Sequence, residues 1–77
     1  MSQVKTLDLR GKPFQQRREL IFAAIESLAL GEAVQIWNDH RPEHLAQVLA
    51  TRFPGRFEAE ITQEGADAWV IHVRRVQ

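Results

Sequence analysis

The sequence of 77 residues contains no cysteine, three prolines, four glycines and no excess of charge of either sign. Without cysteine the chain cannot have a disulfide framework, a thiolate zinc site, an iron–sulfur cluster or thiol chemistry. Ten basic and ten acidic side chains give a formal net charge of zero. The bulk charge therefore does not favour binding to nucleic acid or to an anionic membrane.

Long apolar runs are missing as well. The longest one, Leu20–Ile25, is far shorter than the roughly 20 residues that a membrane-spanning helix requires. The first residues, 1–6, lack the apolar stretch of a secretory signal. We therefore expect a cytoplasmic protein that does not associate with a membrane.

The sequence also lacks motifs that carry catalysis. It has no glycine-rich phosphate-binding loop, and none of its serines or threonines lies in a nucleophile-elbow context. Glu58 and Glu60 alternate along a predicted strand, which places them on a solvated face rather than in a pocket that separates their pKa values. We therefore predict that the protein is not an enzyme and uses no cofactor.

The residues that are present are typical of a small globular domain. Apolar residues make up 44% of the chain and charged residues 26%. A chain of this length buries only about 60% of the surface that it exposes when unfolded, so its core must be thin. The length predicts a single domain over residues 1–77, with a folded core of about 7–75.

Hydrophobic periodicity predicts six elements. Apolar and polar residues alternate, as in half-buried strands, in segments 7–10, 33–37, 57–61 and 69–74. Apolar residues recur at helical spacing in two segments, about 16–28 and from Pro42 to Phe53. Gly31 suits the end of the first helix, because glycine readily adopts the left-handed conformation found there. Pro42 suits the first turn of the second helix, where a missing N–H removes no hydrogen bond.

The resulting order, β-α-β-α-β-β, leaves few topologies when connections are short and crossovers right-handed. It predicts an α+β two-layer sandwich, in which a four-stranded mixed sheet carries two helices side by side on one face. The sheet residues expected to face the helices are Leu7, Leu9, Val34, Ile36, Phe57, Ala59, Ile61, Trp69, Ile71 and Val73. Those expected on the solvated face are Gln35, Trp37, Glu58, Glu60, Val70, His72 and Arg74.

This topology places both strand-to-helix turns at one edge of the sheet. Two helix N-termini, each with unpaired N–H groups and about half a positive charge, then point toward that rim, and ligands of open α/β sheets tend to bind there. The candidate residues for binding a small anion or a partner's carboxylate are Arg10, Lys12, Arg17, Asn38, Asp39, His40 and Arg41, with Arg18 nearby. The alternative is that these are solvated loop residues around two helix starts.

The histidines suggest a metal site only weakly. His40 and His44 are four residues apart, the spacing that places two imidazoles on one helix face, but His40 precedes Pro42 and is predicted to lie outside the helix. His72 belongs to a distant strand, whereas zinc requires three or four protein ligands. We expect titrating surface histidines, with His40 and His44 as the metal-binding alternative.

Four stretches carry a resemblance to a known family. Leu7–Gly11, Leu28–Glu32, Asn38–Pro42 and Pro54–Glu58, in this order and at these spacings, resemble a bacterial domain of unknown function, family 2249. The Asn-Asp-His turn and the Pro-Gly-Arg-Phe-Glu run are the most specific parts. That family is similar to the TusA/SirA sulfur carriers and, through them, to the C-terminal domain of translation initiation factor three. The resemblance covers about residues 7–75 and implies the same two-layer sandwich.

Three positions depart from the pattern that the resemblance implies. TusA-type carriers have a cysteine followed by proline where residues 11–14 read Gly-Lys-Pro-Phe, so persulfide transfer is chemically excluded. Arg41 stands where the family has an aspartate, which would cap the second helix, whereas an arginine cannot accept the helix N–H bonds. Arg18 stands where the family has a histidine. The last two changes each place a cation at the rim.

The sequence therefore favours a small non-catalytic binding or accessory module that docks a protein partner, either at the rim or through Trp37 on the sheet face. The resemblance implies an accessory role in redox or nitrogen-oxide metabolism, because such domains occur beside hemerythrin-like and cupin-type metal proteins. One alternative is a small-anion or metal-ion binder at the rim. Another is RNA binding by analogy with the initiation-factor fold, although a neutral chain with its two tryptophans on different strands offers no nucleic-acid platform.

Overall fold

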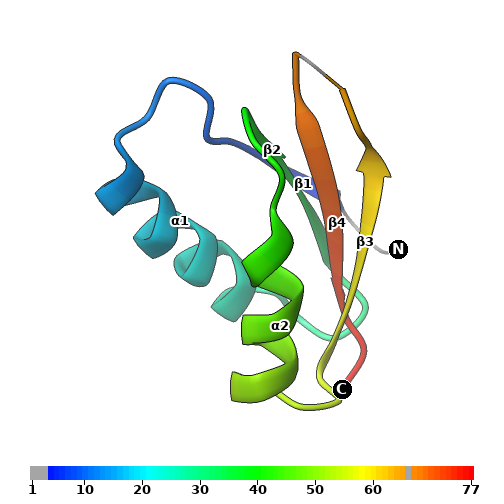
Figure 1. Ribbon diagram of the computed structural model, residues 1–77. Coiled ribbons are helices and arrows are strands. Elements are labelled where there is room, and N and C mark those ends of the chain that lie inside the picture. The colour runs from blue at the N-terminus through cyan, green and yellow to red at the C-terminus, as the bar shows by residue number, and fades with distance from the viewer. Residues whose placement is uncertain (1–3, 66) are drawn as a thin grey trace.

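The chain folds in the predicted order β-α-β-α-β-β. A computed structural model describes residues 4–65 and 67–77, without the side chain of Glu43. Its elements are β1 (Val4–Asp8), α1 (Phe14–Glu26), β2 (Ala33–Asn38), α2 (Glu43–Arg52), β3 (Phe57–Gln63) and β4 (Trp69–Arg75) (Figure 1). Neither helix is long and apolar enough to cross a membrane within this described part of the chain.

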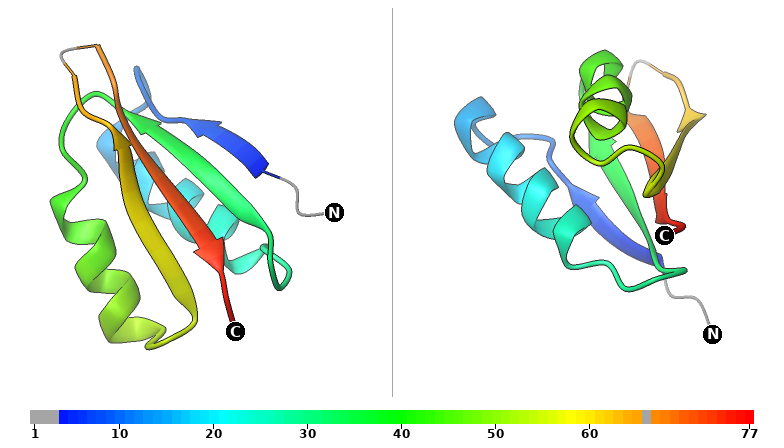
Figure 2. Two further views of the ribbon diagram at one scale, coloured as in Figure 1. Left: turned by 90° about the vertical axis from the view of Figure 1, so that its right-hand side faces the viewer. Right: turned by 90° about the horizontal axis from the view of Figure 1, so that it is seen from below.

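The four strands form one mixed sheet in the order β1-β2-β4-β3. β1 pairs with β2 in parallel, whereas β4 is antiparallel to both β2 and β3. A parallel pair requires a crossover, which α1 supplies. Both helices lie on the same face of the sheet, and Figure 2 shows the other face without a helix over it. The predicted α+β two-layer sandwich is therefore confirmed.

The hydrophobic core lies between the sheet and the two helices. Its buried members come from the two central strands β2 and β4, from both helices and from the segments that follow β1 and α1: Leu9, Ile25, Leu28, Val34, Ile36, Leu49, Ile71 and Val73. None is more than 3% exposed. Burying a side chain of this size contributes roughly 1.5–3 kcal/mol, so these few contacts supply most of the driving force for folding.

Two sheet residues differ from the predicted pattern. Val70, assigned to the solvated face, is only 3% exposed, because it lies directly opposite the large side chain of Trp37 on the neighbouring strand. Ala59, assigned to the core, is exposed. It belongs to the edge strand β3 and lines a shallow hollow with Ala46 of α2, since two methyl groups do not fill the space between these elements.

The first half of the chain also differs in its element boundaries. β1 lies at Val4–Asp8 rather than 7–10, although Leu9 is buried as expected and its N–H continues the pairing by donating to the Trp37 carbonyl at 2.8 Å. α1 runs over Phe14–Glu26 rather than 16–28. Gly31 has the left-handed conformation, φ +86°, but lies in the turn that leads into β2 rather than directly after the helix.

The start of α2 corrects the expectation about its cap. Pro42 is the N-cap residue and Glu43 the first helical one, so Pro42 does not lie in the first turn. An aspartate at position 41 would precede the cap position and could not replace the missing side-chain cap from there. The expectation that Arg41 deprives α2 of a cap is therefore wrong.

Candidate functional site

The two strand-to-helix turns lie side by side, joined by the side chain of Arg17 in the first turn of α1. Its Nη1 donates to Asn38 Oδ1 and to Asp39 Oδ1, both at 2.8 Å, and its Nη2 donates to Asp39 Oδ2 at 3.1 Å. Its Nε donates to the Lys12 carbonyl at 2.7 Å. Arg17 is only 7% exposed, so this guanidinium is a structural link between the turns.

The local backbone explains why these groups meet. Gly11 has φ +81°, a left-handed conformation that lets the chain reverse after β1, so that the Lys12 N–H donates to the Leu9 carbonyl at 3.1 Å. On the other turn, the buried Asn38 accepts from Arg17 and from the Asp39 N–H, at 2.9 Å, through the same Oδ1. A buried amide oxygen thereby has its partners.

The charge of Asp39 is set by Arg17. Hydrogen bonds from the Arg17 guanidinium, followed by the contact with the His40 imidazole, hold the pKa of the Asp39 carboxyl well below its ordinary value of 3.8. The Nδ1 of His40 lies 3.0 Å from Asp39 Oδ1. The carboxylate therefore stays ionised in the folded protein under acidic conditions in which it would be protonated in the unfolded chain.

This shift predicts an acid-dependent loss of stability. Because the folded-state pKa of Asp39 is the lower one, its contribution is fully present above about pH 4 and is lost as the pH falls toward that pKa. We expect the urea midpoint of the native protein to fall as the pH is lowered over this range. The urea midpoint of the Asp39→Asn variant should fall less steeply. Urea titrations of both proteins between pH 2 and pH 6 measure the difference, and parallel curves would contradict it.

Arg10 is occupied in a similar way on the other side of the sheet. Its Nε and Nη2 donate to the two carboxylate oxygens of Asp8, at 3.0 and 2.9 Å, and these bonds lower the pKa of Asp8 to about 2. The guanidinium carbon also lies 5.1 Å from the ring centroid of Trp37. Arg10 therefore covers part of the face through which Trp37 was expected to contact a partner.

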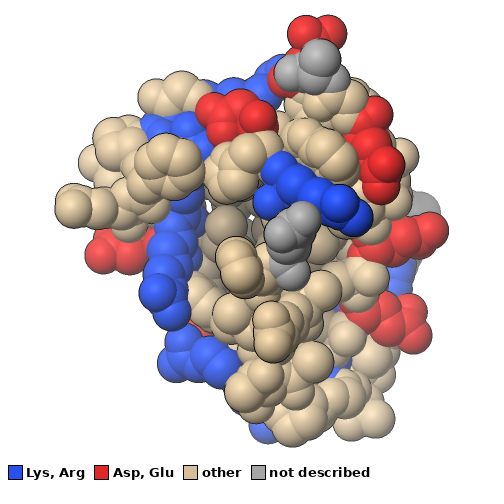
Figure 3. Space-filling model, in the orientation of Figure 1, with Lys and Arg blue, Asp and Glu red and all other residues tan. Residues whose placement is uncertain are grey.

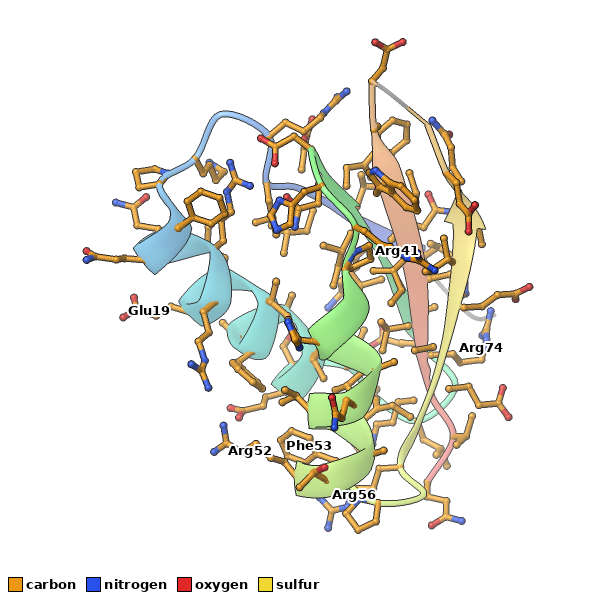
Figure 4. All side chains as sticks on the ribbon, viewed as in Figure 1. Glu19, Arg41, Arg52, Phe53, Arg56 and Arg74 are labelled. Atoms are coloured by element: carbon orange, nitrogen blue, oxygen red, sulfur yellow. The ribbon has the colours of Figure 1, made fainter. Side chains whose placement is uncertain are left out.

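The other predicted rim residues lie where the two turns meet. The ring of His40 lies 5.4 Å from that of Phe14, which is exposed at the start of α1 and also lies under the Arg17 guanidinium. Arg41 points from the start of α2 toward β4, where its guanidinium lies over the Trp69 ring at 5.8 Å (Figure 4). The predicted rim residues therefore lie close together. Arg10 and Arg17, however, are already paired with carboxylates of this chain.

The predicted metal-binding alternative gains no third ligand. His40 and His44 border the same groove, whereas His72 pairs in register with Gln35 in the sheet. Among the described side chains, which exclude that of Glu43, no group of three or more histidine, aspartate or glutamate residues is placed to hold a metal ion.

A groove of about 530 Å³ lies between α1 and α2. Its apolar side chains are Phe14, Ile21, Phe22, Ile36, Leu45 and Val48. Its polar side chains are Arg17, Arg18, Asn38, His40, Arg41 and His44. Figure 3 shows this hollow near the centre of the face, with Lys and Arg side chains on both sides of it.

The groove follows from the way the helices rest on the sheet. α1 packs against β2 and α2 against β3, and the view from below shows the two helices diverging (Figure 2). The sheet residue between them, Ile36 of β2, forms the floor. An apolar floor of this kind favours ligands that bring their own apolar surface.

The charges around the groove are of one sign. Among the side chains that the structure describes, no carboxylate lines it, although the chain has as many acidic as basic residues. The nearest acidic neighbour of Arg18 along α1 is Glu19, and it points away from α2 (Figure 4). Within the described side chains, a ligand in the groove therefore meets guanidinium and imidazole groups, of which Arg17 and His40 already contact Asp39.

One of these cations, Arg18, shares the aromatic ring of Phe22 with Arg52, which does not itself line the groove. The guanidinium carbon of Arg18 lies 5.9 Å from the centroid of Phe22, and that of Arg52, from the last turn of α2, lies 5.1 Å from it. Within the described chain neither arginine forms a hydrogen bond or an ion pair. Cation–π contacts hold both groups in place and leave their N–H groups available.

Four of the predicted rim residues line the groove, namely Arg17, Asn38, His40 and Arg41, whereas the part played by Phe22 and Arg52 was not predicted. Arg18 and Phe22 are four residues apart on one helix, and this spacing predicts their contact. Arg52 joins them only because α2 ends beside Phe22, which no local pattern in the sequence indicates.

One comparison with known proteins gave a match. A family model described as "Uncharacterized conserved protein (DUF2249)" matches residues 6–75. Comparisons with curated proteins and with solved structures gave no match. The matched segment includes every helix and all but the first two residues of the sheet, and the chain therefore belongs to the DUF2249 family of uncharacterized conserved proteins.

Proposed function

We propose that this domain is a non-catalytic binding module whose groove between α1 and α2 receives a partner with an apolar body and an anionic group. One observation carries the proposal: in a chain of zero net charge, Arg18 in the groove and the neighbouring Arg52 have no carboxylate partner within the described residues and lie beside an apolar floor. A volume of about 530 Å³ falls within the range of ordinary ligand sites.

The physical chemistry of the lining explains the preference for an anion. A guanidinium offers a planar set of N–H donors that matches a carboxylate in a two-point hydrogen bond. Contact with the Phe22 ring restricts the positions of Arg18 and Arg52 in advance, so that less side-chain entropy is lost when a ligand binds. The apolar floor supplies affinity and the arginines supply selectivity for charge.

The proposal moves the binding surface from the rim to the groove. Arg10 and Arg17 are held by Asp8 and Asp39, whereas Arg18 and Arg52 have no such partner within the described residues. Docking of a protein partner, the function favoured by the sequence, is retained with the groove as the contact. The accessory role in redox or nitrogen-oxide metabolism stays a prediction from the resemblance.

An NMR titration with simple amphipathic probes tests this function. We expect 3-phenylpropionate to shift backbone amides of groove residues such as Ile21 and Val48, while Gln35 and His72 in the sheet do not move. The uncharged 3-phenylpropanol should bind about tenfold more weakly, because hydrogen bonds to charged groups contribute roughly 1.5–3 kcal/mol. Equal binding of acid and alcohol, shifts centred on Trp37, or no shift at millimolar concentrations would contradict the proposal.

A further inference from the structure

The groove is an elongated trough rather than a closed pocket. Three of its side chains, Phe14, Arg18 and Phe22, follow one another at intervals of four residues along α1. At 1.5 Å per residue they cover about 12 Å of the helix. Leu45 and Val48 of α2 form the facing wall, and the hollow is open toward the viewer in Figure 3.

These dimensions suit a row of side chains projecting from a helix. An amphipathic helix presents apolar anchors at positions i, i+3 or i+4, and i+7, which span about 10.5 Å and so match the trough. A volume of about 530 Å³ admits a few side chains but not a main chain as well. The backbone of such a partner would lie across the opening, above α1 and α2.

The positions of two arginines indicate where acidic residues should lie on that partner helix. Arg18 and Arg52 lie over one ring, so their guanidinium carbons are separated by no more than the sum of their distances from its centroid. Acidic residues one helical turn apart, with roughly 5–6 Å between their Cβ atoms, can reach both arginines. A second copy of this chain would instead bring Arg18 of its own α1 into a cationic groove.

On the basis of the proposed function, we propose that the occupant is an amphipathic helix of a partner protein, with apolar anchors in the trough and acidic residues against Arg18 and Arg52. The apolar anchors contact the floor at Ile36 and the ring of Phe22. The carboxylates accept hydrogen bonds from the two guanidinium groups. The sequence placed Arg18 near the predicted rim but did not indicate Arg52.

Three synthetic peptides of 16 residues test this partner class by fluorescence anisotropy. The first carries leucines at i, i+3 and i+7 with flanking glutamates, the second has glutamine in place of each glutamate, and the third contains the residues of the first in scrambled order. We expect the glutamate peptide to bind about tenfold more tightly than either of the others, and its affinity to fall as salt is raised. Equal binding of the first two peptides would overturn the proposal.

Single substitutions in the full chain locate the contact. Arg18→Gln and Arg52→Gln should each weaken the glutamate peptide about fivefold to tenfold and leave the glutamine peptide unchanged. Arg56→Gln is the matched control, since Arg56 is exposed and neither lines the groove nor is one of the two arginines placed over the Phe22 ring. An equal loss in the Arg56→Gln variant would overturn the assignment to Arg18 and Arg52.

The two proposals fail in different ways. If 3-phenylpropionate shifts the groove amides but the glutamate peptide does not bind, the groove remains a site for a small amphipathic anion and the helical partner is rejected. If neither probe binds, the proposed function is rejected with it. Binding of the peptide without shifts in Ile21 or Val48 would reject the groove as the location for both.

Discussion

Replacing Arg17 with methionine is expected to lower the midpoint of thermal unfolding by about 6–24 °C, since hydrogen bonds to charged groups contribute roughly 1.5–3 kcal/mol in general and each kcal/mol shifts the midpoint of a domain of this size by roughly 4–8 °C. The methionine keeps the apolar stem of the side chain but removes its bonds to Asn38, Asp39 and the Lys12 carbonyl. The two turns then lose their link, and the buried Asn38 loses a donor. Thermal unfolding followed by circular dichroism measures the change.

Arg18→Met is the matched control for this prediction. Arg18 is the next residue on the same helix and is exposed, and its guanidinium lies over the Phe22 ring without a hydrogen bond or ion pair to any described residue. We expect its midpoint to stay within about 2 °C of the native value, as for most surface substitutions. Equal effects of the two substitutions would show that Arg17 is not a structural link. A double-mutant cycle with Asp39→Asn isolates the ion pair itself.

Leu49→Ala is expected to reduce the free energy of unfolding by about 2–5 kcal/mol. Leu49 is 3% exposed and, among the described side chains of α2, is the one that is buried in the core. Its truncation leaves a cavity between α2 and the sheet, in a domain whose small size limits its total stability. Urea denaturation measures the loss.

The neighbouring substitution Val48→Ala provides the comparison for Leu49→Ala. Val48 is half-buried and lines the groove, so its truncation removes fewer contacts and opens onto solvent. We expect Val48→Ala to reduce the free energy of unfolding by less than about 1.5 kcal/mol. A larger loss at Val48 than at Leu49 would mean that the core does not lie where the fold places it.

The fold could be predicted because the two periodicities are distinct in this chain. Alternation in 33–37 and 69–74 and helical spacing in 16–28 each fit one kind of element, and the short connections then restrict the topology. The two wrong predictions of side-chain burial concern residues whose exposure depends on a neighbouring element. Val70 is buried because Trp37 lies opposite it, and Ala59 is exposed because α2 does not cover the edge strand at that point.

The candidate site could be predicted only in part. Adjacency of the two turns follows from parallel pairing of β1 and β2, and Arg17, Asp39 and His40 indeed meet there. That Arg17 is neutralised by Asp39 depends on side-chain geometry across the two turns. The groove depends on how far α1 and α2 diverge, which is a property of packing and leaves no local pattern in the sequence.

The most direct test of the groove as the binding site is to fill it without changing any charge. Val48→Trp places a large side chain in the groove, whereas Gln47→Trp adds the same side chain at an exposed position of α2. Titration of both variants with 3-phenylpropionate should show binding lost in Val48→Trp and retained in Gln47→Trp, with both proteins keeping native-like NMR spectra. Undiminished binding to a folded Val48→Trp variant would contradict this assignment.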